Sequence, residues 1–501
     1  MKIRDLLEHH GVLGNPFADE DAQTDLIFKG HCVKTTFHTA WDKLYGNPAE
    51  PSTAIVFGEK GAGKTALRLQ MIRMLTEYNT DHPEARPLVV DYADLNPFLD
   101  RFRNRFPRSR KIQKVLARWE IWDHLDAILS LSVTQLVDRI LDPGAASHPA
   151  AVDNKPIPIE KLSPHQVRDL LLLAVCYDTS RSENIFNRWK RLSKKLRYGN
   201  WKSFFTERRE SGIGVLGTIL GVGGLYRWTD SLGFLLNGWF YLFLFVLWFL
   251  FFRKAFQRWT KAWAVRRSLR TLPHLTSELC SVLMRLRKQD FPGMPFPVGG
   301  STDNRYAMLE KLLGVCEPLG LRGLIVMMDR VDEPYLINGS ADLMKLLVWP
   351  ILDNKLLKHD RVGLKLLLPD QLLRFMERED KAFHERARID KQNLVRSLDW
   401  TGESLLDLAD ARLKACAADG TSPKIVDFFD PALDRKRLID AFAQLKVPRH
   451  LFKFLYKVFG IHVNAHTDWE PVWKIPATTF ESTLALYLRD REAAERNLGV
   501  V

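Results

Sequence analysis

Five short apolar runs recur along the chain, and each has the length of a buried β-strand. They occupy residues 52–57, 88–92, 323–328, 362–368 and 393–398. Stretches with helical periodicity separate them, and residues 95–185 are mainly helical in pattern. Apolar strands that alternate with helices are typical of a parallel sheet covered on both faces. The pattern predicts an α/β fold with a parallel five-stranded core sheet, followed from residue 404 by a helical C-terminal region.

One stretch, residues 211–252, is far more apolar than the rest of the chain. Within it, residues 232–252 form a run of 21 without a charged side chain, which is long enough to cross the ~30 Å hydrocarbon core of a bilayer. Residues 212–226 are also uncharged but form a shorter run, in which Gly217 and Gly221 make a GxxxG face suited to close helix packing. The sequence therefore predicts an inserted two-helix transmembrane hairpin.

Both flanks of this stretch are basic. Residues 186–270 contain 17 lysines and arginines against three acidic residues, so their net charge of +14 exceeds the +13 of the whole chain. Cations concentrate on the cytoplasmic side of membrane helices, which places both ends of the hairpin in the cytoplasm. A hydrophobic hairpin buried in a soluble protein is the alternative, but a soluble core has no need for so many flanking cations.

The length of the chain and its cysteines constrain the number of structural units and the cellular compartment. A chain of 501 residues exceeds what one hydrophobic core normally supports, so we expect two or three structural units. The five cysteines are scattered and form no CxxC pair, which predicts buried thiols in a reducing compartment and no zinc site. The N-terminal residues lack an apolar core, so we expect no cleaved signal peptide.

A glycine-rich motif follows the first predicted strand and opens a helix. It reads GxxxxGKT and consists of Gly58, Glu59, Lys60, Gly61, Ala62, Gly63, Lys64 and Thr65. In this context the motif is a P-loop, or Walker A motif, whose backbone N–H groups surround the phosphates of a nucleotide. Lys64 would reach the β- and γ-phosphates of ATP, and the Thr65 hydroxyl would bind Mg²⁺. The motif therefore predicts ATP and Mg²⁺ as cofactors.

An acidic partner for this motif follows the third predicted strand. Asp329 lies at the end of the apolar run 324–328 and is the expected Mg²⁺ ligand of a Walker B motif. Asp332 and Glu333 come next, and either could orient and deprotonate the attacking water. The sequence leaves open which of the two is the catalytic base.

Walker A, a distant Walker B and a membrane hairpin between them resemble the KAP P-loop NTPases. The wider relatives are the STAND and origin-recognition-type AAA+ ATPases, and the resemblance covers residues 10–460. One departure concerns the Walker B motif, which in KAP proteins usually reads Asp-Asp-Leu-Asp-Arg. Here Arg330 follows the first acid, which leaves the hydrolysis rate and the identity of the base open.

The resemblance also implies roles for residues outside the two Walker motifs. Residues 15–17, Asn-Pro-Phe, are similar to the entry segment that packs near the adenine, and Arg449 matches the sensor-2 arginine of the lid. Arg386 and Arg388 precede the fifth strand, where these families often carry an arginine finger; a solvated charged surface is the alternative. Asp370 follows the fourth strand, at the expected position of a sensor-1 polar residue.

Four regions follow from this interpretation. Residues 1–185 and 271–400 would form the two parts of the P-loop NTPase domain, residues 186–270 the hairpin, and residues 401–501 the helical lid. We expect an inner-membrane protein with two transmembrane helices and a cytoplasmic ATPase domain, which hydrolyses ATP slowly without a partner. It would act as a nucleotide-dependent switch or assembly scaffold in bacterial signalling or defence, as a homo-oligomer with a protein partner that the sequence does not name.

Two other functions compete with this one. An origin-recognition-type ATPase would handle nucleic acid, but residues 460–501 are short and not basic enough for a DNA-binding domain. A P-loop kinase acting on a small molecule is the third hypothesis, which an ATPase assay without added acceptor would separate from the first. Nucleic acid is therefore not the expected partner.

Overall fold

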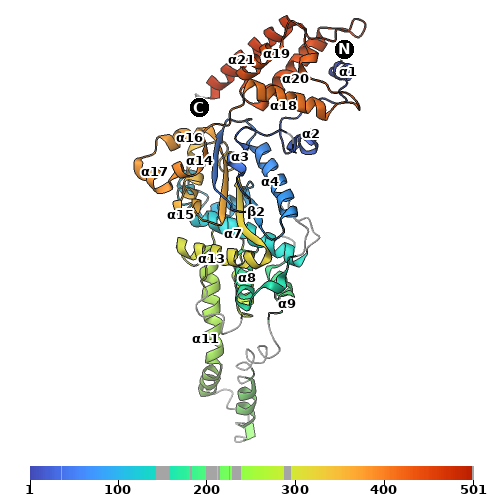
Figure 1. Cartoon of the computed structure of the whole chain (residues 1–501). Coiled ribbons are helices and arrows are strands. Elements are labelled where there is room, and N and C mark those ends of the chain that lie inside the picture. The colour runs from blue at the N-terminus through green and yellow to red at the C-terminus, as the bar shows by residue number, and fades with distance from the viewer. Residues whose placement is uncertain are drawn as a thin grey trace. The chain divides into compact units, whose positions relative to one another are not determined.

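The computed structural model describes residues 1–34, 36–142, 157–180, 183–198, 212, 215–224, 226–227, 238–286 and 295–498 (Figure 1). The chain divides into two compact units. Unit 1 comprises residues 1–82, 325–348 and 352–501, and unit 2 comprises residues 83–324 and 349–351.

A five-stranded parallel sheet forms the α/β part of the molecule, as the sequence predicts. The strand order is β2-β3-β4-β1-β5. The strands are β1 (Ala54–Gly58), β2 (Arg86–Asp91), β3 (Leu321–Met328), β4 (Val362–Pro369) and β5 (Asn393–Val395). β1 pairs with β4 on one side, with Val56 opposite Leu367, and with β5 on the other, with Val56 opposite Val395. Because β1 is covered by neighbours on both edges and buried on both faces, its carboxyl end is held in a fixed position.

Unit 1 also contains the helices before β2 and those between β3 and β5 along the chain. α4 begins at Lys64, within the glycine-rich motif, and runs for 18 residues. The helices before β2 are α1 (Ile3–His9), α2 (Leu26–Gly30), α3 (Trp41–Tyr45) and α4 (Lys64–Asp81). Those between β3 and β5 are α14 (Ala341–Val348), α15 (Asn354–Leu357), α16 (Asp370–Glu377) and α17 (Lys381–Ala387).

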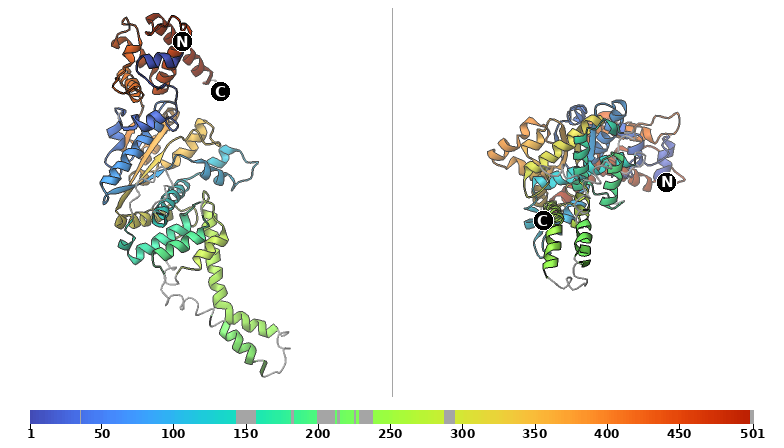
Figure 2. Two further views of the ribbon diagram at one scale, coloured as in Figure 1. Left: turned by 90° about the vertical axis from the view of Figure 1, so that its right-hand side faces the viewer. Right: turned by 90° about the horizontal axis from the view of Figure 1, so that it is seen from below.

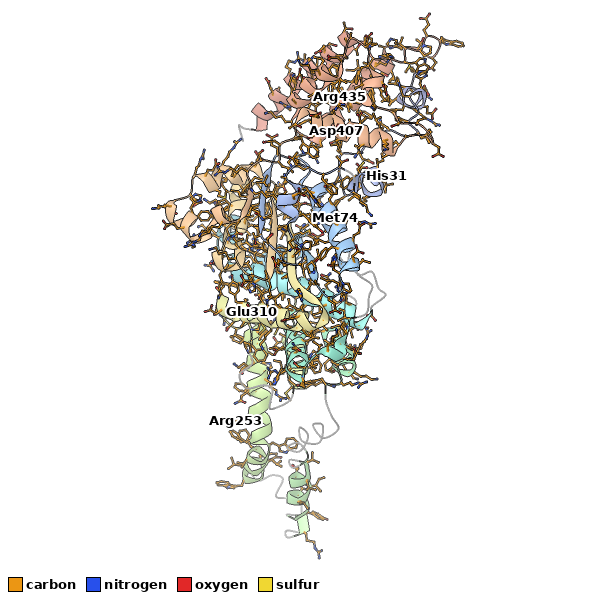
Figure 3. The ribbon with its side chains drawn as sticks, viewed as in Figure 1. His31, Met74, Arg253, Glu310, Asp407 and Arg435 are labelled. Carbon is orange, nitrogen blue, oxygen red and sulfur yellow. The ribbon has the colours of Figure 1, made fainter. Side chains whose placement is uncertain are left out.

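The C-terminal helices form a cluster that includes the N-terminus of the chain (Figure 2). They are α18 (Gly402–Ala415), α19 (Arg435–Leu445), α20 (Pro448–Asn464) and α21 (Ala477–Leu498). Leu6 and Leu7 of α1 and the buried ring of Phe17 belong to the same hydrophobic core as the inward faces of these helices. On the outer side of the cluster, Asp407 of α18 and Arg435 of α19 face each other at 3.9 Å (Figure 3). Side-chain caps stabilise the starts of α18 and α19. The Thr401 hydroxyl accepts a hydrogen bond from the backbone N–H of Ser404, and the Asp434 carboxylate accepts one from the backbone N–H of Arg437.

Unit 2 is mainly helical. Its helices are α5 (Asn96–Arg103), α6 (Ile112–Leu116), α7 (Ile121–Leu141), α8 (Pro164–Tyr177), α9 (Ile185–Lys195), α11 (Gly238–Ser268), α12 (Thr276–Leu283) and α13 (Thr302–Cys316). A buried ion pair ties three of them together, because Asp126 of α7 accepts hydrogen bonds from Arg305 of α13 and from Tyr177 of α8. Asp123, one turn earlier on α7, pairs with Arg270 just beyond α11.

The predicted membrane hairpin lies only partly within the described residues. α11 includes residues 238–252 of the long uncharged run, whereas residues 228–237, with the start of this run and the connecting turn, lie outside the described residues. Among the helices that the structure describes, none is both long enough and apolar enough to span a bilayer. Residues 215–224 are helical, and Thr218 accepts a hydrogen bond from the Trp248 indole of α11 at 3.1 Å.

Candidate functional site

The glycine-rich loop 58–65 connects the end of β1 to the start of α4. Gly61 and Gly63 both have φ of +95°, a left-handed conformation that favours glycine. A Cβ atom on Gly61 would lie 2.6 Å from Cβ of Arg449, so no larger residue fits there without a shift. The loop therefore brings backbone N–H groups to the N-terminus of an 18-residue helix, an arrangement that favours anions.

Lys64 is the first residue of α4, and its side chain folds back over the loop. Its Nζ donates to the carbonyl oxygens of Gly58 at 2.7 Å and of Glu59 at 2.9 Å. Burial lowers the pKa of Lys64, while the nearby carboxylates of Asp329, Asp332 and Asp370 oppose this shift. The ammonium group is thus held at the loop by neutral acceptors, with carboxylates rather than a direct ion pair supplying the compensating charge.

Asp329 directly follows β3 and is almost fully buried. Its Oδ2 atom accepts from the Thr65 hydroxyl at 2.9 Å and lies 3.3 Å from Nε of Arg68. Burial raises the pKa of this carboxyl, and Arg68 and Thr65 counteract the rise. The structure therefore brings Thr65 and Asp329 together although 264 positions separate them along the chain.

The two acids after Asp329 differ in their surroundings. Arg330 adopts a left-handed φ of 59°, and its guanidinium pairs with the half-exposed Glu333 at 2.7 Å. Asp332 accepts from Gly339 N through its backbone carbonyl. Both acids line the same cavity as Asp329, so the choice of a base between them stays a prediction.

Two residues of the C-terminal region reach the glycine-rich loop. The indole N–H of Trp400 donates to the carbonyl of Ala62 at 2.9 Å, and the backbone N–H of Arg449 approaches the carbonyl of Gly61 at 3.4 Å. The Arg449 side chain lies 3.8 Å from Glu20, which also pairs with Lys453 at 3.3 Å. α20 is therefore in contact with the loop at its first turn.

These elements enclose a cavity of about 520 Å³, which lies wholly within unit 1. This volume falls within the range of ordinary small-molecule sites. Its polar lining includes Lys60, Lys64, Thr65, Asp329, Asp332, Glu333, Asp370, Arg412 and Arg449, and its apolar lining includes Phe28, Trp400, Leu408 and Phe452. The cavity thus combines a charged end, where the glycine loop lies beside the acids that follow β3, with an apolar end at α2 and the C-terminal helices.

The N-terminal Asn-Pro-Phe segment supports the apolar end of the cavity. Phe17 packs 6.0 Å from the ring of Phe452, and Arg412 donates to the carbonyl of Pro16 at 2.6 Å. Arg412 also pairs with Asp25 at 2.6 Å and lies over the Phe452 ring at 4.5 Å. This segment is therefore part of the wall, behind the residues that face the cavity.

Arg386 and Arg388 lie elsewhere. Both are exposed, Arg386 on α17 and Arg388 at its C-cap with a φ of 46°. Neither lines the cavity. A role in the site of the same chain is therefore not supported by their positions, and a role toward a neighbouring copy stays a prediction.

Several residues of the site are not predicted by the sequence motifs. Three of them line the cavity: His38, Trp400 and Arg412. The fourth, Arg68, contacts the buried carboxylate of Asp329. Arg68 carried a usable signal, because it lies four residues after Lys64 and so on the same face of α4. The other three belong to segments far from the motifs, and no local pattern links them to the loop.

The oxygen atoms of Thr65 and Asp329 fit a magnesium ion better than a transition metal. Mg²⁺ is typically bound by one or two protein oxygens together with waters and substrate phosphates. Across the residues that the structure describes, no group of three or more His, Cys, Asp or Glu side chains is placed to hold a metal. Any metal at this site would therefore need further ligands from solvent or from a bound phosphate.

Comparison of the chain with protein-family models, with curated proteins and with solved structures found no match. The five-stranded parallel α/β fold is consistent with several families of nucleotide-binding proteins and specific to none of them. Function must accordingly be argued from the site itself.

Proposed function

We propose that this chain is a P-loop ATPase that binds MgATP in the cavity of unit 1. The observation that carries the proposal is the 2.9 Å hydrogen bond between Thr65, at the start of α4, and Asp329, at the end of β3. A chance match to GxxxxGKT would not be expected to have its threonine in contact with a buried acid at the end of another core strand. The carboxyl ends of β1 and β3, which β4 separates in the sheet, lie at the same edge, where α/β proteins bind nucleotides.

Each residue of the cavity has a defined task in this proposal. The N–H groups of loop 58–65 and the Lys64 ammonium would bind the β- and γ-phosphates, for which Lys64 must exchange its two carbonyl acceptors. Thr65 and Asp329 would hold Mg²⁺, which when bound supplies positive charge to the phosphates. Arg449 would leave Glu20 for the phosphates, and the apolar end near Trp400 and Phe452 would take the base.

Hydrolysis requires a carboxylate that orients a water molecule. Glu333 and Asp332 line the cavity, and Glu333 must first be released from its ion pair with Arg330. This pair offers a reason for slow basal turnover, because the candidate base is neutralised in the absence of a partner. If Arg386 or Arg388 completes the site of a neighbouring copy, activity rises more than linearly with protein concentration.

We also propose that the ATPase is attached to a membrane through residues 211–252. Two features support this part: the uncharged run of residues 232–252 with its basic flanks, and the exposed apolar side chains on α11, among them Leu242, Phe245 and Val246. In the helical residues 215–224, Gly217, Thr218 and Gly221 are half-buried, whereas Leu216, Ile219 and Leu220 are exposed. An exposed apolar surface of this kind is typical of a membrane or protein interface.

Calorimetric titration with MgATP tests the central proposal. Lys64→Ala should weaken binding roughly 10- to 150-fold, since a hydrogen bond to a charged group contributes about 1.5–3 kcal/mol, while the melting temperature of the protein stays unchanged. Lys60→Ala, which removes a cation from the same loop without a designated phosphate contact, is the matched control. Unchanged MgATP affinity in Lys64→Ala would refute the phosphate site.

Turnover measurements then decide between the two acids. Glu333→Gln should keep MgATP affinity and reduce hydrolysis about 100-fold or more, as expected for the loss of a general base. If Asp332→Asn loses turnover and Glu333→Gln does not, Asp332 is the base.

A further inference from the structure

A strongly basic surface lies in unit 2, outside the nucleotide site and outside the apolar stretch. Residues 101–118 contain eight lysines and arginines and no acidic residue. They span the end of α5, the loop that follows, and α6. We define the basic surface as this segment together with Arg266 and Arg267 at the C-terminal end of α11.

The backbone of this segment is held in a defined conformation by one of its own arginines. The Arg103 guanidinium donates to the carbonyl oxygens of Phe106, Pro107, Arg108 and Arg110 at 2.8–3.3 Å. Two further guanidinium groups lie over the Phe106 ring, that of Arg110 at 5.7 Å and that of Arg118 at 5.6 Å from its centroid. The loop thus presents its cations on a preorganised frame, which reduces the entropy lost on binding.

Arg105 joins this loop to α11. Its guanidinium donates to the carbonyl oxygens of Arg266 and Leu269, both at 3.1 Å. Burial and the positive charges of Arg266 and Arg270 lower the pKa of Arg105. Like charges are therefore crowded at this junction, which costs free energy in the isolated protein and favours an anionic ligand.

Six cations of this surface have no carboxylate partner among the described residues. Among the residues that the structure describes, none forms an ion pair with Arg105, Arg108, Arg110, Lys111, Lys114 or Arg118. Asp100 and Glu120 lie just outside the segment, and the nearby Asp123 is already paired with Arg270. The side chains of Arg108, Lys111, Lys114 and Arg118 are exposed.

Geometry favours a nucleic acid over a membrane surface as the occupant. Arg266 follows Phe252, the last residue of the uncharged run, by 14 positions of α11, about 21 Å along a helix. That distance exceeds two Debye lengths at physiological salt, each about 8 Å, so lipid charges at the end of the run would act weakly here. Planar guanidinium groups suit the phosphate oxygens of a nucleic-acid backbone.

We propose that the basic surface binds the sugar–phosphate backbone of a nucleic acid. Binding is electrostatic and independent of base sequence, because the exposed groups are charges on flexible side chains rather than base-reading contacts. It does not depend on the nucleotide site, so Lys64→Ala binds nucleic acid as the wild type does.

The test uses the full chain in neutral detergent and fluorescence anisotropy with labelled mixed-sequence oligonucleotides: single-stranded DNA, single-stranded RNA and duplex DNA. The surface variant carries Arg108→Gln, Arg110→Gln, Lys111→Gln and Lys114→Gln. The control variant removes four exposed cations from unit 1, through Arg378→Gln, Lys414→Gln, Lys436→Gln and Arg489→Gln. Both variants have the same net charge, and thermal melting checks that both are folded.

The wild type and the control should bind at least one of the three oligonucleotides with a strong salt dependence. The surface variant should lose about four units of the slope of log K against log salt, and at least about 100-fold in affinity at physiological salt. Equal losses in both variants, or a wild type that binds none of the three at about 50 mM salt, would overturn the proposal. Co-sedimentation with acidic phospholipid vesicles completes the test: vesicle binding lost only in the surface variant, with nucleic-acid binding unchanged, assigns this surface to the membrane instead.

Discussion

Asp126 in unit 2 and Asp329 in unit 1 are both buried carboxylates that meet a buried arginine, yet their surroundings differ. Asp126 accepts from Nε and a terminal nitrogen of Arg305 at 3.3 and 3.4 Å and from the Tyr177 hydroxyl at 3.1 Å. Asp329 is in contact with Thr65 and Arg68 and also lines a cavity of about 520 Å³. The Asp126 carboxylate is enclosed by its protein partners, whereas the Asp329 carboxylate has one side open to a ligand.

The comparison shows that a buried Asp–Arg pair does not by itself mark a functional site. Burial raises the pKa of both carboxyls, and in both the arginine opposes the rise. What distinguishes the two is the access of a ligand or water to the remaining lone pairs. The closed pair fixes the packing of α7, α8 and α13, whereas the open pair can exchange one partner for a cation.

Removing the arginine of the closed pair should have the largest effect. Arg305→Leu leaves the Asp126 carboxylate buried without its main partner, and we expect a loss of about 3–5 kcal/mol in the stability of unit 2. Denaturant unfolding measures it. The surface pair Arg437–Glu481, whose side chains are 35% and 42% exposed, provides the control: Arg437→Leu should cost at most about 1 kcal/mol. Similar losses in both variants would contradict the comparison.

A second closed group of unit 2 should make its stability depend on pH. His274 is buried, its Nε2 lies 2.7 Å from the carbonyl of Cys176, and burial lowers its pKa to about 4. Because the native state resists protonation, its contribution is complete above about pH 6.5 and is lost as the pH falls to about 4, about 3 kcal/mol in all. His274→Gln should flatten this part of the pH profile of unfolding, and the exposed His384→Gln should not. Identical pH profiles of unfolding in the wild type, His274→Gln and His384→Gln would refute the assignment of this pH dependence to His274.

The open pair should tolerate the loss of its arginine better and should respond to ligand. Arg68→Leu is expected to cost about 1–3 kcal/mol, because water can reach Asp329 through the cavity. MgATP should restore much of the lost melting temperature, since Mg²⁺ replaces the missing positive charge; ATP with a chelator should restore less. Arg305→Leu should gain no more from MgATP than the wild type does. If MgATP rescues neither variant, Asp329 is a structural residue like Asp126.

The smallest effect is expected where the C-terminal region contacts the glycine-rich loop. Trp400→Phe removes one hydrogen bond, that from the indole to the Ala62 carbonyl at 2.9 Å, and keeps an aromatic ring in the wall. We expect about 1 kcal/mol weaker MgATP binding, or roughly fivefold, in the same titration that tests Lys64→Ala. A loss as large as that of Lys64→Ala would mean that Trp400 contacts the nucleotide directly.

The sequence predicted the strands and the order of the helical regions well, because apolar runs and glycine punctuation are local signals. β3 begins two residues earlier than expected, at Leu321, and β5 ends three residues earlier, at Val395. The last three predicted positions of β5 are Arg396, Ser397 and Leu398, where only the leucine is buried. Strand ends depend on the sheet neighbours, which a local pattern does not contain.

The motif residues were predictable, and the wall of the cavity was not. Thr65 and Asp329 each belong to a recognisable motif, so their proximity could be expected. Trp400 lies 338 positions from Ala62, and nothing near it in sequence indicates a contact with the loop. The net charge of large regions does not reveal the basic surface either: the chain outside residues 186–270 is close to neutral, because acidic residues elsewhere balance the cations of residues 101–118.

Because Arg105 is hydrogen-bonded to the C-terminal end of α11, a rotation of the helix at that end would be amplified along its length. α11 has 31 residues, so it extends for about 46 Å, and Arg105 holds the carbonyls of Arg266 and Leu269 at one end. For a rigid rod of this length, a tilt of about 10° at the held end moves the far end by about 8 Å. Small rotations at the basic surface would thus become large displacements at Gly238, and a load applied at Gly238 would act with the same leverage on the loop around Phe106.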